Sequence, residues 1–228
     1  MRISSIMAAA AILAGAGAAH GAVVSSFEAA GVQTSTVHAD NVETDTFPTD
    51  TAASVIGAYS GQLSVVPADQ YGGAGGTGYY IETAPGGNDT FTLTLNKAAN
   101  YFGLWISALD AGNTMTFYNG ATAVGSFSAS DVPANFYNYG AGYDHNPNGS
   151  QPANYGQPYF FVNFSDTTGT FDSVVFTENG TTFGNFEMDN LTAGLVPEPA
   201  TWAMMVLGAG LLGAGLRFTR QGRGVSAA

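Results

Sequence analysis

The sequence predicts an all-β fold. Between its two ends the chain is rich in Gly, Thr, Asn, Tyr and Phe and poor in Leu, Glu and Lys, a composition that favours strands and tight turns over helices. About ten short segments have strand character, and none has a convincing helical period. Many short strands separated by turn residues are typical of two packed sheets, so we expect an antiparallel β-sandwich, jelly-roll-like in topology.

The clearest strand is 90–96, where Phe91, Leu93 and Leu95 alternate with threonines. This alternation predicts that the threonines face water and the three apolar side chains face the core. Segment 101–108 is apolar on both faces, which places it in the middle of a sheet. The other predicted strands are 23–29, 62–66, 79–83, 114–119, 122–128, 159–164, 171–178 and 183–192.

Turn residues separate these strands. Segment 110–113 and the pair Asn119-Gly120 have the chemistry of tight antiparallel connections. Two stretches lack strand character: 71–78, which we expect to be a flexible glycine loop, and 132–158, which is dominated by Asn, Tyr, Gly and Pro. A loop of the second length inside a compact domain is usually functional or disordered.

The first 21 residues have the pattern of a secretory signal peptide. Arg2 precedes an apolar, alanine-rich run at 6–19, and small residues follow it. We expect cleavage before Ala22, although cleavage after Ala19 also fits. The Sec translocon and signal peptidase are therefore predicted partners.

The predicted ectodomain, 22–195, is strongly acidic. It contains sixteen of the seventeen acidic residues but only Lys97 among the basic ones, so its formal charge is −15. Such a surface repels phosphate backbones, which excludes nucleic-acid binding. Acidic polysaccharide is also repelled unless divalent cations bridge the two. The chain has no cysteine, so core packing, with or without bound metal, must hold the exported domain, and thiol catalysis is excluded.

The C-terminal segment, 196–228, joins a Pro-Glu-Pro tripeptide, an apolar helix at about 200–218 and a basic tail. The prolines stop any preceding strand because their rings offer no backbone N–H. The arginines that follow the apolar run would hold that end on the cytoplasmic side of a membrane. The residues that define this pattern are Pro197, Glu198, Pro199, Trp202, Arg217, Arg220 and Arg223.

This tail resembles the PEP-CTERM sorting signal of exosortase-dependent bacterial surface proteins. The resemblance implies that a membrane protease-transferase, the exosortase, recognises Pro-Glu-Pro and removes the helix. It also implies an inner-membrane intermediate, followed by delivery to the cell surface or extracellular matrix of a Gram-negative bacterium. One departure is that the arginine run is interrupted (RFTRQGR). The alternative is an ordinary membrane anchor. However, the apolar run itself, 202–216, has fifteen residues and spans only about 22 Å of the ~30 Å hydrocarbon core of a bilayer, so we expect transient membrane contact.

The ectodomain also looks like those of other exosortase-dependent surface proteins. The residues that carry this second resemblance lie between 101 and 191 and read YFGLWISALDAGNTMTFYNG, YFFVNF, FDSVVF and FEMDN. It implies a sandwich domain whose biochemistry is unassigned.

Calcium is the one cofactor that the sequence suggests. In jelly-roll modules the two terminal strands commonly lie side by side, and similar modules bind structural Ca²⁺ with acids from both. Glu28 would come from the opening strand, and Glu187 and Asp189, which share a face, from the closing one. Covered carboxylates need a partner, and Ca²⁺ accepts six to eight oxygen ligands. The alternative is that these acids are simply solvated.

The long loop suggests a sugar-binding surface. Tyr137, Tyr139, Tyr143 and Tyr155 could stack on pyranose rings while neighbouring asparagines bond hydroxyls. The alternative is a polar adhesive or disordered loop.

Catalytic motifs are absent from the sequence: there is no GxSxG, HExxH, P-loop or dinucleotide fingerprint. We therefore expect a non-enzymatic protein that is structural or adhesive in exopolysaccharide or biofilm. The alternatives are a secreted lectin-like carbohydrate-binding module and a secreted carbohydrate-active enzyme.

Overall fold

The computed structural model describes residues 23–37, 42–148, 155–180 and 184–196. The predicted signal peptide at 1–21 and the predicted sorting segment from Pro197 onward lie outside these residues. Within the described ranges, no helix is both long enough and apolar enough to cross a membrane.

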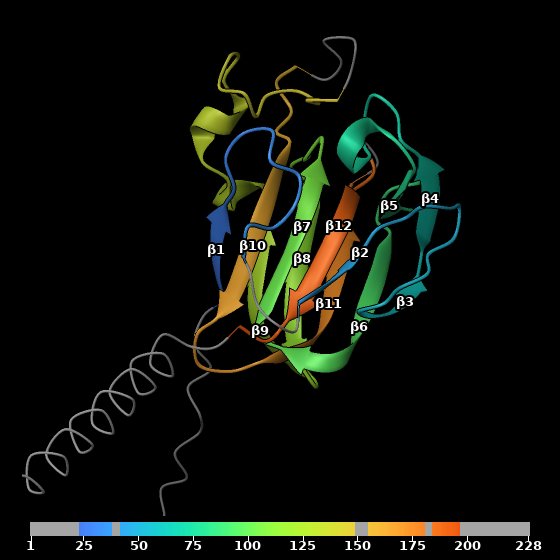
Figure 1. Ribbon diagram of the computed structural model, residues 1–228, viewed down its shortest axis with the longest axis vertical. Helices are drawn as coiled ribbons and strands as arrows, with labels where there is room; N and C mark the ends of the chain where they lie inside the picture. The colour runs from blue at the N-terminus through green and yellow to red at the C-terminus, as the bar shows by residue number, and fades with distance from the viewer. Residues whose placement is uncertain (1–22, 38–41, 149–154, 181–183, 197–228) are drawn as a thin grey trace, which may run out of the picture.

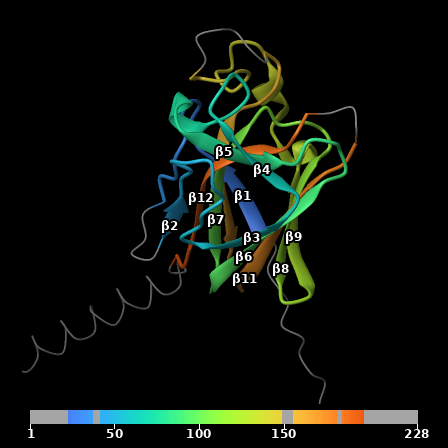
Figure 2. The same cartoon turned by 90° about the vertical axis from the view of Figure 1, so that its right-hand side faces the viewer.

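Two antiparallel sheets pack face to face (Figures 1 and 2), which confirms the predicted sandwich. In the larger sheet the order is β1-β10-β7-β12-β5-β4, and β2 pairs with β12 off this path. Its strands are β1 (Val23–Phe27), β2 (Glu43–Asp45), β4 (Leu63–Pro67), β5 (Tyr79–Thr83), β7 (Tyr101–Ser107), β10 (Phe160–Asp166) and β12 (Glu187–Gly194).

The smaller sheet has the order β3-β6-β11-β8-β9. Its strands are β3 (Gly57–Gly61), β6 (Thr90–Ala99), β8 (Asn113–Asn119), β9 (Thr122–Ser128) and β11 (Phe171–Glu178). Three short 3₁₀ turns lie in the connections: η1 (Ala74–Gly76), η2 (Ala129–Asp131) and η3 (Ala134–Tyr137).

Eight of the strands form a jelly roll. From β5 to β12 the chain fills one sheet in the order 5-12-7-10 and the other in the order 6-11-8-9, so every connection except the β8–β9 hairpin crosses from one sheet to the other. The four strands β1 to β4 are additions at the sheet edges, apart from β2, which bonds to the end of β12.

This topology corrects the expected neighbour of the closing strand. We expected β1 to lie beside β12, but β10 and β7 stand between them. The reason is that β1 precedes the jelly roll and is not its first strand. That position belongs to β5, which does pair with β12.

The core lies between the sheets and is dominated by phenylalanine. Phe91 of β6 stacks on Phe176 of β11 with ring centroids 4.7 Å apart. Phe91, Leu93 and Leu95 are all buried, which confirms the alternation predicted for this strand. Strand β7 is buried along its whole length between β10 and β12, which confirms its central place.

The two non-strand stretches pack against the sheets. Ala74 of η1 covers a second apolar cluster on the outer face of the larger sheet, formed by Trp105, Ala108, Tyr159 and Phe161. In the long connection, Phe136 of η3 makes edge contacts with aromatic rings of β1 and β10. Among the described residues of this connection there is no strand.

Candidate functional site

The point where the chain leaves the sandwich is held by an asparagine side chain. Asn100 lies between β6 and β7, and its amide makes two hydrogen bonds with the backbone of Val196. The Nδ2 group donates to the Val196 carbonyl at 2.8 Å, and Oδ1 accepts from the Val196 N–H at 2.8 Å. Val196 is the residue directly before Pro197, so this contact lies immediately before the predicted sorting motif.

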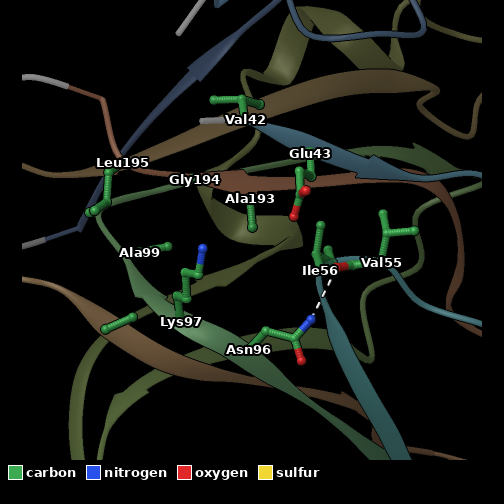
Figure 3. Close-up of a pocket in the computed structure, with 11 residues that line it drawn as sticks. Val42, Glu43, Val55, Ile56, Asn96, Lys97, Ala99, Ala193, Gly194 and Leu195 are labelled. Atoms are coloured by element: carbon green, nitrogen blue, oxygen red, sulfur yellow. Dashed lines mark hydrogen bonds between the residues drawn. The ribbon is translucent and has the colours of Figure 1, made fainter. Parts of the chain in front are cut away.

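A cavity of about 620 Å³ lies beside this exit (Figure 3). Its walls come from β2, β6, the end of β12 and the residues before β3. Glu43 and Lys97 point into it from opposite walls, and Asn96 Nδ2 donates to the Val55 carbonyl at 3.0 Å on its floor. Lys97, the single Lys or Arg of the predicted ectodomain, therefore lines the same cavity as the end of β12 and Leu195.

An exposed aromatic patch, Tyr139, His145 and Tyr155, lies in the long connection. The side chains of Tyr139 and Tyr155 are 81% and 45% exposed. Ring centroids are 5.0 Å apart for Tyr139 and Tyr155 and 5.2 Å apart for His145 and Tyr155. Bare ring faces with polar neighbours are the arrangement that sugar rings stack on.

Buried Asp144 supports the patch from below. It accepts hydrogen bonds from the Gly140 N–H at 3.1 Å and from His145 Nδ1 at 3.1 Å. Burial alone would raise the pKa of Asp144, but these hydrogen bonds outweigh it and hold the pKa below its ordinary value. The carboxylate is therefore ionised at neutral pH and orients the His145 ring.

The structure separates the four tyrosines that we grouped from the sequence. Tyr143 stacks on Phe136 at 3.7 Å, and its hydroxyl donates to the Glu28 carbonyl at 2.9 Å. Tyr137 is half-buried and bonds the Ala129 carbonyl at 3.4 Å. Both pack against the fold, so only Tyr139 and Tyr155 present ring surface, and His145, which we did not group with them, completes the patch.

The patch and the chain exit lie at opposite ends of the sandwich. The long connection leads into β10 at Phe160, which pairs with Ile106, near the end where β12 begins. The exit follows Gly194, which pairs with Tyr101 at the other end. Figure 1 shows η3 and the end of β12 at opposite ends of the strands. Eight residues of β12, roughly 25 Å of extended chain, separate the two ends.

The three predicted calcium ligands do not come together. Glu28 follows β1, where it accepts hydrogen bonds from Asn163 Nδ2 at 2.8 Å and from the Thr36 N–H at 3.0 Å. Burial raises its pKa, but these hydrogen bonds bring the pKa below its ordinary value. Three strand spacings, roughly 14 Å, separate β1 from β12, which carries Glu187 and Asp189.

Glu187 instead faces Glu82, which sequence reasoning missed. Glu82 of β5 and Ser107 of β7 are the cross-strand neighbours of Glu187 on either side. Glu187 and Glu82 are only 7% and 8% exposed, and neither Glu187 Oε2 nor Ser107 Oγ has a hydrogen-bond partner. Burial, and then the nearby Glu82 carboxylate, raises the pKa of Glu187 well above its ordinary value. Register, and not any local motif, creates this carboxylate pair.

Asp189 lies under the glycine-rich loop. Its carboxylate accepts hydrogen bonds from the Ala74 N–H at 2.8 Å and the Asn190 N–H at 2.7 Å. Burial raises the pKa of Asp189 to about 6 even though both hydrogen bonds lower it. Within the described ranges, no three Asp, Glu, His or Cys side chains are grouped closely enough to hold a metal ion by themselves.

Comparison with known protein families identifies the C-terminal segment. The PEP-CTERM protein-sorting motif matches residues 195–221. The motif, directly after a closed sandwich domain, defines an exported bacterial cell-surface protein that is processed at the membrane by an exosortase. The chain therefore carries a PEP-CTERM sorting domain at residues 195–221.

No curated protein matches the chain. Among solved structures, the fold is similar to the catalytic domain of a GH87 alpha-1,3-glucanase in complex with tetrasaccharides, at 21% identity and a TM-score of 0.37. The likeness covers 67% of this chain and 29% of that one, and at this level it carries no functional information.

Proposed function

We propose that this protein is a non-enzymatic structural or adhesive component of the exopolysaccharide or biofilm matrix of a Gram-negative bacterium. The Sec translocon would export it, signal peptidase would remove residues 1–21, and the exosortase would separate the sandwich from its membrane helix. The observation that carries the proposal is the arrangement of the domain. The chain leaves the sandwich at one end, directly before the sorting motif, and the exposed aromatic patch lies at the other end.

The charge of the ectodomain supports an extracellular role of this kind. Its acids greatly outnumber its single lysine, and Lys97 lies near the exit and not near the patch. The patch therefore meets its partner through ring faces and hydrogen bonds, which suits a neutral polysaccharide better than an anionic one.

The sorting step is tested by changing the motif. Replacing Pro197 and Glu198 with alanine leaves the sandwich intact, so we expect the full-length precursor to accumulate in the inner-membrane fraction. The unaltered chain should reach the surface or the medium. Export of the double variant to the surface at the normal level would refute the proposal.

The exposed patch favours carbohydrate binding as a second candidate function. Tyr139→Ala removes the most exposed ring, and Tyr71→Ala, which removes a 43% exposed ring elsewhere, is the matched control. We expect neutral polysaccharide to quench the tyrosine fluorescence of the wild type and of the control, and expect Tyr139→Ala to weaken retention on that polysaccharide severalfold. Equal retention of all three proteins would rule the patch out.

We also propose that the Glu82–Glu187 pair binds calcium, with Glu82 in the place that we first gave to Glu28. Two buried carboxylates side by side cannot both ionise without a nearby cation, and an unpartnered carboxylate oxygen and the Ser107 hydroxyl line the same position. Oxygen-only donors completed by water suit Ca²⁺.

Thermal melting tests the calcium proposal. At pH 7.5, millimolar Ca²⁺ should raise the melting temperature of the wild type and of the control Glu43→Gln, an exposed acid on β2. The same calcium should have no effect on Glu187→Gln. An unchanged melting temperature of the wild type would show that a proton, and not a metal, relieves the pair.

A further inference from the structure

The contact between Asn100 and Val196 has the form of a strand pairing made by a side chain. An amide group offers one donor and one acceptor, and here both are used on the N–H and C=O of a single residue. The backbone ladder of β12 cannot continue into the sorting motif through Pro197, because proline has no N–H. The side chain of Asn100 thus hydrogen-bonds the N–H and C=O of Val196, the last residue before the motif.

Asn100 is itself fixed by two neighbouring strands. Its N–H donates to the Gly194 carbonyl at 3.2 Å, at the end of β12, and its carbonyl accepts from the Asp166 N–H at 2.9 Å, at the end of β10. The side chain is partly buried. The backbone of Asn100 is therefore held on both sides by the larger sheet. Its side-chain amide, which extends from this fixed backbone, holds Val196 in turn.

We propose that Asn100 is a positioning residue for sorting, which presents Pro197-Glu198-Pro199 to the exosortase at a fixed distance from the sandwich. The proposal rests on the exosortase-dependent sorting given above. With Val196 fixed, three residues remain before the predicted helix at about 200, a reach of roughly 10 Å. The enzyme then meets a motif whose preceding residue, Val196, is already fixed, which lowers the entropy lost on binding.

The matched pair of variants is Asn100→Ala and Asn96→Ala. Asn96, four residues earlier on β6, also makes one side-chain hydrogen bond to a backbone carbonyl, that of Val55. Both variants lose a stabilising amide, but only the first releases Val196. In pulse–chase labelling of cells, we expect Asn100→Ala to slow conversion of precursor to mature protein about fivefold or more, and Asn96→Ala to leave it unchanged.

Two further variants separate positioning from stability. Asn100→Asp keeps an oxygen for the Val196 N–H but loses the donor, so its conversion rate should lie between those of the wild type and Asn100→Ala. Inserting Gly-Ser between Val196 and Pro197 keeps the contact and the domain but displaces the motif, so conversion should slow while the melting temperature stays at the wild-type value.

The Pro197→Ala, Glu198→Ala double variant provides the reference. If it is converted normally, the sorting function itself is wrong. If it is blocked while Asn100→Ala matures at the wild-type rate, only the positioning role is overturned. Equal slowing of Asn100→Ala and Asn96→Ala, or normal conversion of the insertion variant, would overturn it as well.

Discussion

At the scale of single residues, several buried carboxyl groups have a raised pKa. Asp189 and Glu187 are 4% and 7% exposed and have a raised pKa because burial disfavours the ionised form. Burial likewise raises the pKa of Glu82 and the pKa of Glu178. For Glu178, the nearby Asp89 and Asp110 carboxylates raise the pKa further. Folding of the domain is therefore more favourable when these carboxyl groups are protonated.

This predicts that the isolated ectodomain is more stable at pH 5 than at pH 8 when calcium is removed with EDTA. A raised folded pKa stabilises the protein at low pH, and that stability is lost as the pH rises from the unfolded value near 4 through the folded value. For Asp189, whose pKa rises from 3.8 to about 6, only the part of the effect above pH 5 falls in this range, about 1.4 kcal/mol. From Asp189 alone the melting temperature should fall by on the order of 3–6 °C.

The variant Glu187→Gln isolates the carboxylate pair in this pH dependence. It removes the charge that faces Glu82, so its melting temperature should exceed that of the wild type at pH 8 and fall less between pH 5 and pH 8. The lowered pKa values of Glu28 and Asp144 act only below about pH 4 and do not disturb this range. A melting temperature that rises from pH 5 to pH 8 would contradict the account.

Residue identities in the candidate sites were only partly predictable from the sequence. Tyr139 and Tyr155 could be named as candidates, together with the other loop tyrosines, because the loop is rich in Asn, Gly and Pro and has no strand pattern. Tyr143 was not separable from them, because its stacking on Phe136 depends on how the loop folds back. Glu82 has no local signal at all, because its pairing with Glu187 arises from strand register across more than one hundred residues of chain.

At the scale of the element, strands with clear apolar patterns were predictable, and so were the edge strands β1, β4 and β9, but β2 and β3 were not. β6, β7 and β11 carry strong apolar patterns that match their burial. β2 has three residues, two of them acidic, and β3 reads Gly-Ala-Tyr-Ser-Gly, so neither has intrinsic strand preference. Backbone pairing with β12 and β6 makes these two segments strands.

Close backbone approach explains a glycine at the start of β3. A Cβ atom at Gly57 would lie 2.2 Å from the Thr94 carbonyl oxygen of β6, a contact that neither backbone can accept unchanged. We therefore expect Gly57→Ala to destabilise the ectodomain by about 1–3 kcal/mol. Urea unfolding measures this, with Ser60→Ala on the exposed part of the same strand as the control. Equal stability of the two variants would show that β3 does not need this close approach.

At the scale of the whole molecule, the two ends of the sandwich carry different features. One end carries the exit, with Asn100 on Val196 and Lys97 in the adjacent cavity. The other carries the exposed Tyr139 and Tyr155. The sequence predicted the sandwich and the tail separately, but this opposition depends on strand direction and pairing, which only the fold defines.

The fate of both chain ends tests the central claim most directly. Mass spectrometry of the protein recovered from the surface or the medium should show an N-terminus at Ala22 and a C-terminus that lacks the apolar segment at about 200–218. Recovery of the protein with that segment still attached, in cells that contain an active exosortase, would contradict the sorting account and identify the tail as a permanent anchor.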